Sequence, residues 1–138
     1  MPVTYQILAD LGIVYVRYDG PMDVAESGAL FASYMADPGF RPGQKQLVDL
    51  SRITGYERDF AGLLALQAKK AEAFLQGPET IIVYYAPGGV AREVAHLAMR
   101  SWENLDAIVA LVQDTEAGTL SVLGLSETSF SALIQGAV

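Results

Sequence analysis

The sequence predicts an α/β domain with a mainly parallel sheet and helices packed on its faces. Strand-like and helix-like segments alternate along the chain, which is typical of parallel sheets with right-handed crossovers. The apolar run at residues 81–85, Ile-Ile-Val-Tyr-Tyr, shows no polar alternation, as expected for a strand that is covered on both faces. The length of 138 residues suits one ordinary domain. We therefore expect a single domain over residues 1–138.

Residues 4–18 predict an N-terminal β-hairpin. Apolar and polar residues alternate before a glycine-containing turn at residues 10–12, and an apolar run follows that turn. The cluster Tyr-Asp-Gly-Pro at residues 18–21 is expected to end the second strand. Asp23 can then cap a first helix, which is expected at residues 24–36.

The stretch at residues 45–75 is expected to organise the rest of the chain. Its apolar run predicts a buried strand at residues 46–50, in the middle of the sheet, followed by a polar turn at 51–56. Helical spacing then predicts a long amphipathic helix at 57–75. Its inward face is expected to hold Phe60, Leu63, Leu64, Ala71, Phe74 and Leu75. The residues expected to face elsewhere are Arg58, Gln67, Lys70 and Glu72, with the pair Lys69 and Lys70 solvated.

The C-terminal half continues the alternation of strands and helices. The expected order is strand 81–85, helix 89–103, strand 107–112, a helix from Asp114 or Thr115 to residue 123, and a last helix through residue 133. Ser126 can cap the last helix.

The composition argues against several classes of function. The formal net charge is −7 without a basic stripe, which disfavours binding to nucleic acid or to an anionic membrane surface. We find no cysteine, no apolar run that could span a membrane, and no basic-then-apolar leader, so a cytoplasmic bacterial-type protein is expected. His96 is the single histidine, and no nucleophile–base pair or acidic metal-ligand spacing occurs. No catalytic residue, metal or cofactor is therefore predicted, and enzyme activity is the least favoured class.

Residues 37–66 carry a resemblance to a known family. The sequence DPGFRPGQKQLVDLSRITGYERDFAGLLAL resembles the SpoIIAA-like proteins, which are relatives of the STAS domains of bacterial anti-anti-sigma factors. Three features support it: the Asp-Pro-x-Phe-x-Pro-Gly loop, the Leu-Val-Asp-Leu strand end, and the Thr-Gly turn into a helix. The resemblance implies a single SpoIIAA/STAS-like domain over nearly the full chain.

The chain departs from this family at the phosphorylation site. In STAS anti-anti-sigma factors, a serine shortly after this strand is phosphorylated, within a pattern that resembles Asp-Leu-Ser, a spacer and Asp-Ser-Ser-Gly. Residues 49–51 keep Asp-Leu-Ser, but residues 57–62 read Glu-Arg-Asp-Phe-Ala-Gly and contain no serine or threonine. Ser51 matches the first serine and not the acceptor. We therefore expect no switching by serine phosphorylation at the usual site, where Asp59 could hold a permanent negative charge.

The first functional hypothesis is a non-enzymatic protein-interaction or regulatory module of STAS-like type. A protein partner is expected, and a second copy of the chain is kept open as that partner. The expected partner-binding residues are Ser51, Arg52, Thr54, Glu57, Arg58 and Asp59. Because ligands of open α/β sheets sit at the carboxyl ends of the strands, an anion or ligand edge is also expected. Its residues would be Asp49, Gly88, Gly89 and Arg92. The alternative is that Asp49 and Ser51 satisfy loop amides and that the glycines only form a tight turn.

The second hypothesis is a carrier or sensor of a small apolar or lipid-like ligand, which the resemblance makes conceivable. Aromatic residues that could line such a pocket are Phe60, Phe74, Tyr84, Tyr85 and Trp102. The alternative is an ordinary aromatic core. Trp102 lies near a helix end, so it is also considered as a partly exposed interface anchor.

Overall fold

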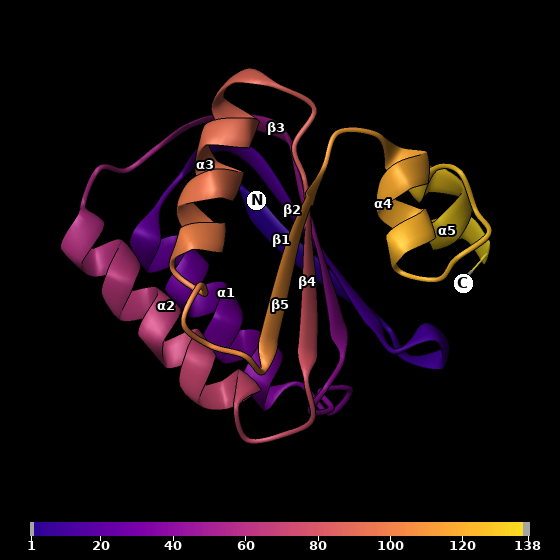
Figure 1. Ribbon diagram of the computed structural model, residues 1–138, viewed down its shortest axis with the longest axis horizontal. Coiled ribbons are helices and arrows are strands. Elements are labelled where there is room, and N and C mark those ends of the chain that lie inside the picture. Colours follow the sequence, from indigo (N-terminus) through magenta and orange to yellow (C-terminus); the bar gives the residue numbers. More distant parts are fainter. Residues whose placement is uncertain (1, 137–138) are drawn as a thin grey trace.

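The computed structural model describes residues 2–136, and its centre is a five-stranded sheet with the strand order β1-β2-β3-β4-β5 (Figure 1). The strands are β1 (Val3–Leu8), β2 (Ile13–Met22), β3 (Lys45–Tyr56), β4 (Thr80–Tyr85) and β5 (Ile108–Gln113). The first two strands pair antiparallel and the other three pairs are parallel. The predicted fold class, a β-hairpin leading into a mainly parallel sheet, is thereby confirmed. The predicted position of the buried strand at residues 46–50 in the middle of the sheet is also confirmed, since these residues belong to β3.

Helices cover both faces of the sheet. They are α1 (Val24–Ala36), α2 (Phe60–Phe74), α3 (Gly89–Arg100), α4 (Glu116–Val122) and α5 (Phe130–Gly136), with a short 3-10 helix at Ala9–Leu11 between β1 and β2. Because α1, α2 and α3 each connect neighbouring parallel strands in one direction across the sheet, right-handed crossovers place them on the same face. Figure 1 shows these three helices on one side of the sheet and α4 with α5 on the other. Residues 1, 137 and 138, at the ends of the expected domain, lie outside the described residues.

Strands β2 and β3 are longer than the sequence predicts. The expected turn at 51–56 is part of β3, and β2 continues through the cluster at 18–21 to Met22. The two extensions pair with each other, as at Pro21 and Gly55, and two register shifts allow this pairing. The pairing of β1 with β2 ends at Tyr18, so Pro21 lies where β2 has no partner on that side. A proline is tolerated at such an edge because its missing N–H leaves no ladder bond unmade.

Side-chain caps set most of the helix starts. Asp23 caps α1 as predicted, since its Oδ1 accepts from the Glu26 amide at 2.9 Å. The second helix begins at Phe60 and not at residue 57, because the Asp59 carboxylate accepts from the Gly62 amide at 3.0 Å and acts as its cap. Thr115, one of the two predicted starts of α4, accepts from the Gly118 amide at 3.0 Å.

The start and cap predicted for the last helix are wrong. Helix α5 begins at Phe130, and the serine whose hydroxyl accepts a first-turn amide is Ser129, from Ala132 at 3.1 Å. Ser126 lies in the preceding loop. Helix α3 ends at Arg100, three residues before its predicted end, and Trp102 follows it as a buried side chain that is 3% exposed. The expectation of a partly exposed tryptophan is therefore wrong.

The central strands divide their side chains between two apolar layers. Leu47 of β3 and Val83 of β4 point toward α4 and α5, and both are fully buried. Leu50 and Ile82 point to the other face, where they pack with the first three helices. Complete burial of an aliphatic side chain stabilises a fold by about 1.5–3 kcal/mol, so these alternating residues account for much of the stability of the sheet.

Thr80 offers a test of this packing. The residue is 1% exposed, and its Oγ1 is the buried side-chain oxygen that lacks a hydrogen-bond partner among residues 2–136. We expect Thr80→Val to raise the free energy of unfolding by about 1 kcal/mol, because an unsatisfied hydroxyl is replaced by a methyl group of similar size. Urea denaturation measures the difference.

Thr119→Val is the matched control for this substitution. Thr119 is also fully buried, but its Oγ1 donates to the Thr115 carbonyl at 2.8 Å. Removing that bond is expected to leave the stability unchanged or lower it. A Thr80→Val variant that is less stable than the parent would contradict the expectation.

Candidate functional site

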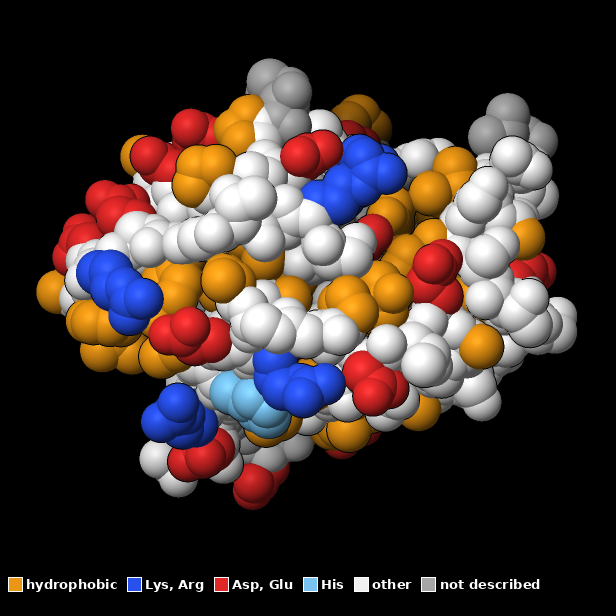
Figure 2. Space-filling model, turned by 90° about the horizontal axis from the view of Figure 1, so that it is seen from above, with side chains coloured by type: hydrophobic (Ala, Val, Ile, Leu, Met, Phe, Trp, Pro, Cys, Tyr) orange, Lys and Arg blue, Asp and Glu red, His pale blue; other side chains and the backbone are white. Residues whose placement is uncertain are grey.

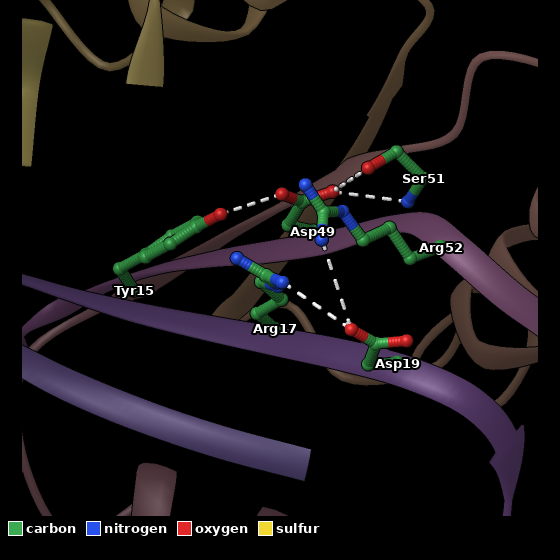
Figure 3. Close-up of polar contacts among 6 residues, drawn as sticks. All are labelled: Tyr15, Arg17, Asp19, Asp49, Ser51 and Arg52. Atoms are coloured by element: carbon green, nitrogen blue, oxygen red, sulfur yellow. Dashed lines mark hydrogen bonds and ion pairs between the residues drawn. The ribbon is translucent and has the colours of Figure 1, made fainter. Parts of the chain in front are cut away.

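Asp49 lies at the carboxyl edge of the sheet and is 5% exposed. It pairs with Tyr85, the last residue of β4. The Tyr15 hydroxyl donates to Asp49 Oδ2 at 2.5 Å, and the Ser51 amide and hydroxyl donate to Oδ1 at 2.9 and 2.6 Å (Figure 3). Burial and the bond to Asp49 raise the pKa of Tyr15, so this hydroxyl remains a donor at neutral pH. The carboxylate therefore has three donors from its own chain.

These bonds stabilise a bulge in β3. Between the pairs Arg17–Asp49 and Asp19–Arg52, β3 contains one residue more than β2. The Ser51 amide, which lies within this irregular step, donates to Asp49. Asp49 and Ser51 thus satisfy local backbone and side-chain groups, which is the alternative to an anion site.

Beside Asp49, an exposed group of charges joins the two extended strands. Arg17 and Arg52 lie 3.2 and 3.8 Å from the Asp19 carboxylate (Figure 3). The three side chains are 37–61% exposed. Exposed ion pairs contribute at most about 1 kcal/mol to stability, so these residues shape the surface charge more than they hold the fold.

The six predicted partner-binding residues are all exposed, but they form two groups. Ser51, Arg52 and Thr54 belong to the β3 extension. Glu57, Arg58 and Asp59 lie between β3 and α2, where Glu57 Oε1 accepts from the Val24 amide at the start of α1 at 2.9 Å. Asp59 is the α2 cap.

Arg58 is held between β3 and α3. Its guanidinium carbon lies 4.5 Å from the centre of the Tyr56 ring, and Nη1 donates to the Tyr56 hydroxyl at 2.9 Å. Nη1 also lies 3.7 Å from Glu93, which accepts from the same hydroxyl at 2.7 Å. The start of α2 therefore carries charged side chains in defined positions.

No described contact links Asp49 to the other three residues of the predicted anion edge. Gly88 and Gly89 have φ angles of 153° and 49°, a backbone that requires glycine, and they lead into α3 on the face opposite the Asp49 contacts. Arg92 is exposed on α3. An anion site at Asp49, Gly88, Gly89 and Arg92 stays a prediction.

The predicted inward face of α2 is partly wrong. Phe60, Leu64 and Leu75 are 47%, 62% and 46% exposed. The inward side chains follow the spacing Leu63, Leu66, Lys70 and Phe74, with Gln67 beside them. Since α2 is rich in alanine and leucine on nearly all sides, periodicity alone did not determine which face turns inward.

A pocket of about 280 Å³ lies between the first three helices and the sheet. Of the five aromatic residues predicted to line a pocket, Phe60, Phe74, Tyr84 and Trp102 do so. Tyr85 does not, because it points to the other face and packs on Phe130, with 5.0 Å between the ring centres. The exposed Phe60 and Leu64 also belong to the wall, so the pocket reaches solvent near the start of α2.

Lys70 lines this pocket, so its assignment to the solvated side of α2 is wrong. The side chain keeps some exposure, but burial lowers the pKa of its ammonium group from 10.5 to about 8. Nζ lies 5.9 Å from the centre of the Phe31 ring, and within residues 2–136 it makes no ion pair or hydrogen bond. Lys69 is exposed, as predicted. The sequence does indicate that Lys70 turns inward, because it lies four residues after Leu66 and four before Phe74.

Polar side chains elsewhere in the pocket wall have hydrogen-bond partners within the protein. The Tyr34 hydroxyl donates to Gln44 Oε1 at 2.6 Å and accepts from Gln46 Nε2 at 3.2 Å. Gln67 Nε2 donates to the Ser101 hydroxyl at 2.8 Å. Lys70 is thus distinguished by its charge and by its lack of a partner.

Comparison with known proteins supports the fold and no closer relationship. No family model and no curated protein matches the chain. The comparison with solved structures shows that the chain has a SpoIIAA-like, STAS-like fold. One similar structure is that of the anti-sigma factor antagonist SpoIIAA in its unphosphorylated form, with a TM-score of 0.50 and 14% identity over 88% of this chain and 97% of that one. Identity at this level shows a shared fold, and function has to be argued from the site.

Residues 2–136 contain neither a membrane-spanning helix nor a cluster of metal-ligating side chains. No helix in this part of the chain has the length and apolarity of a membrane span. The same residues contain no group of three or more His, Cys, Asp or Glu side chains placed to hold a metal ion.

The position of Lys70 can be tested through stability. Its pKa is lower in the folded chain than in the unfolded one, so the unfolded chain binds more protons between pH 8 and 10.5, and stability rises with pH over that window. We expect Lys70→Met to be more stable than the parent at pH 7 by about 1–2 kcal/mol, a gap that narrows above pH 8. Chemical denaturation at pH 7 and 9.5 measures it. Lys69→Met is the control, and an identical effect of both substitutions would mean that Lys70 is solvated.

Proposed function

We propose that the protein is a non-enzymatic regulatory module that binds a protein partner at the start of α2. The observation that carries this proposal is the exposure of Phe60 and Leu64, which are 47% and 62% exposed on successive turns of the helix. The SpoIIAA-like fold supports it, because one solved structure with this fold is that of an anti-sigma factor antagonist. We name the residues Glu57, Arg58, Asp59, Phe60 and Leu64 the α2 surface.

The α2 surface has the composition of a binding site. Two apolar side chains form its centre, and Glu57, Arg58 and Asp59 surround them with charge of both signs. Figure 2 shows apolar side chains gathered at the left of the view, on the side where α2 begins, with basic and acidic side chains beside them. An apolar centre with a polar rim is the usual anatomy of a protein interface. Large exposed apolar side chains that lie together mark such sites.

Serine phosphorylation at the usual site is not part of this proposal. Position 59 holds the aspartate that caps α2, and no hydroxyl side chain occurs in residues 57–62. The α2 surface therefore has a constant charge. Ser51, Arg52 and Thr54 are proposed to extend the surface along β3.

Substitutions in the α2 surface should separate binding from folding. We expect Leu64→Lys to lower recovery of a specific partner at least tenfold, which corresponds to about 1.4 kcal/mol of binding energy, because a charge is placed in the apolar centre. Arg58→Glu should act in the same direction. Affinity purification of the tagged protein with quantitative mass spectrometry provides the measurement, and circular dichroism verifies the fold.

Val122→Lys is the matched control, since Val122 is 41% exposed on α4, across the sheet. Asp59 is best replaced by asparagine, which removes the charge but keeps the cap. If Leu64→Lys recovers every partner as well as Val122→Lys does, the α2 surface is not the binding site.

A second function, carriage of a small apolar ligand, is proposed on a separate observation. The pocket of about 280 Å³ has mainly apolar walls and approaches the size of sites that bind small molecules. Trp102, the one tryptophan of the chain, belongs to its wall. Ligand entry should therefore change the fluorescence of this residue.

Filling the pocket should abolish such binding. Ala98 lines the pocket, and we expect Ala98→Phe to weaken the binding of 1-decanol at least tenfold, because the new ring takes up the space. Titration followed by Trp102 fluorescence measures the affinity. Ala32→Phe, at an exposed position of α1, should bind like the parent. Absence of any saturable change in the parent protein would contradict the proposal.

A further inference from the structure

We propose that the pocket binds an amphiphile with a carboxylate head group and a hydrocarbon chain, and that Lys70 is the counterion of the carboxylate. This inference rests on the second proposed function, carriage of an apolar ligand, and names the chemical class of that ligand. Four features of the pocket carry it: the charge of its wall, the state of its other polar groups, its size, and the absence of further cationic donors.

The charge of the wall selects an anion. The chain has 16 acidic and 9 basic residues, yet Lys70 is the one charged residue among the described side chains that line the pocket. Its ammonium group has no carboxylate partner within residues 2–136. A desolvated charge without a partner is unfavourable, and an incoming carboxylate would supply both the opposite charge and an acceptor.

The remaining polar side chains of the wall each have a hydrogen-bond partner already. The hydroxyls of Tyr18 and Ser27 lie 3.0 Å apart, and Trp102 Nε1 donates to the Tyr84 hydroxyl at 3.0 Å. Gln67 is bonded to Ser101. A ligand therefore meets one strong unpaired donor, Lys70, in an otherwise apolar wall. This arrangement favours a single head group over a ligand with polar groups along its length.

Size and donor number narrow the class further. A volume of about 280 Å³ lies just below the range of small-molecule sites, which suits a hydrocarbon chain of medium length better than a long one. No arginine lines the pocket within the described residues. A phosphate head group would require more donors than one ammonium group provides, whereas a carboxylate needs only one counterion.

The pH dependence of binding follows from Lys70. The other titratable groups that line the pocket are tyrosines from four strands and one helix: Tyr5, Tyr18, Tyr34, Tyr56 and Tyr84. Burial or hydrogen bonding raises the pKa of each, so they stay neutral while Lys70 titrates near pH 8. Affinity for a carboxylate should be constant from about pH 6, where the ligand is ionised, to pH 8. It should fall above that pH as the ammonium group loses its proton.

The test compares decanoate with 1-decanol, which has the same chain length and no charge. At pH 7 we expect the parent protein to bind decanoate at least tenfold more tightly than decanol. Lys70→Met should lose this preference and keep its affinity for decanol, whereas Lys69→Met should behave like the parent. Isothermal titration calorimetry or Trp102 fluorescence gives the six affinities of the three proteins for the two probes, and the preference of the parent should decline at pH 9.5.

The outcomes distinguish this inference from the function on which it rests. Equal binding of the two probes by the parent would overturn the carboxylate assignment and leave the apolar carrier in place. A decanoate preference that survives in Lys70→Met, or that does not decline at pH 9.5, would overturn the role of Lys70. Binding of neither probe would overturn the carrier function and this inference together.

Discussion

The central position of β3 is the constraint on which the rest of the structure depends. With β2 and β4 as its parallel neighbours, β3 is covered on both faces, and its alternating side chains supply both apolar layers. Leu47 faces α4 and α5, and Leu50 faces the first three helices. A shift of the strand by one residue would exchange these two environments and place Asp49 in the wrong layer. The register of β3 therefore determines where the Asp49 cluster lies at the sheet edge and which β3 side chains line the pocket on the opposite face.

Asp49 marks the point at which β3 leaves the four-stranded parallel part of the sheet. Beyond its pair with Tyr85, β3 continues beside β2 alone, and the bulge held by Asp49 allows the change. The paired extensions bring the chain to Glu57, which binds the start of α1, and to Asp59, which caps α2. The segment before α2 is thus bound to α1 through Glu57 and to α3 through Arg58, so the exposed apolar side chains at the start of α2 have a defined position.

The order of the strands could be predicted from the sequence because each strand contains an apolar or alternating run, and the short connections between these runs leave few topologies. The β3 extension could not, because Ser-Arg-Ile-Thr-Gly-Tyr has no strong strand pattern and becomes a strand only by pairing with residues that themselves read as breakers. The orientation of α2 could not be predicted either, since leucine and alanine lie on almost all of its sides. Residue type predicts a solvated Lys70, because lysine is rarely buried. Its helical position between Leu66 and Phe74 indicated the opposite.

The inner face of α2 is not what selection for stability alone would produce. Lys70 and Gln67 stand at inward positions where leucine would fill the space against Phe31 and Trp102. A desolvated ammonium group lowers stability, and unfilled apolar volume lowers it by several kcal/mol in a packed core. Both unfavourable features lie on one helix face and open toward the same pocket. The other polar side chains of the pocket wall each have a hydrogen-bond partner, so poor packing in general does not explain the arrangement. The proposed binding of an amphiphile, gained at the expense of stability, would account for both features at once.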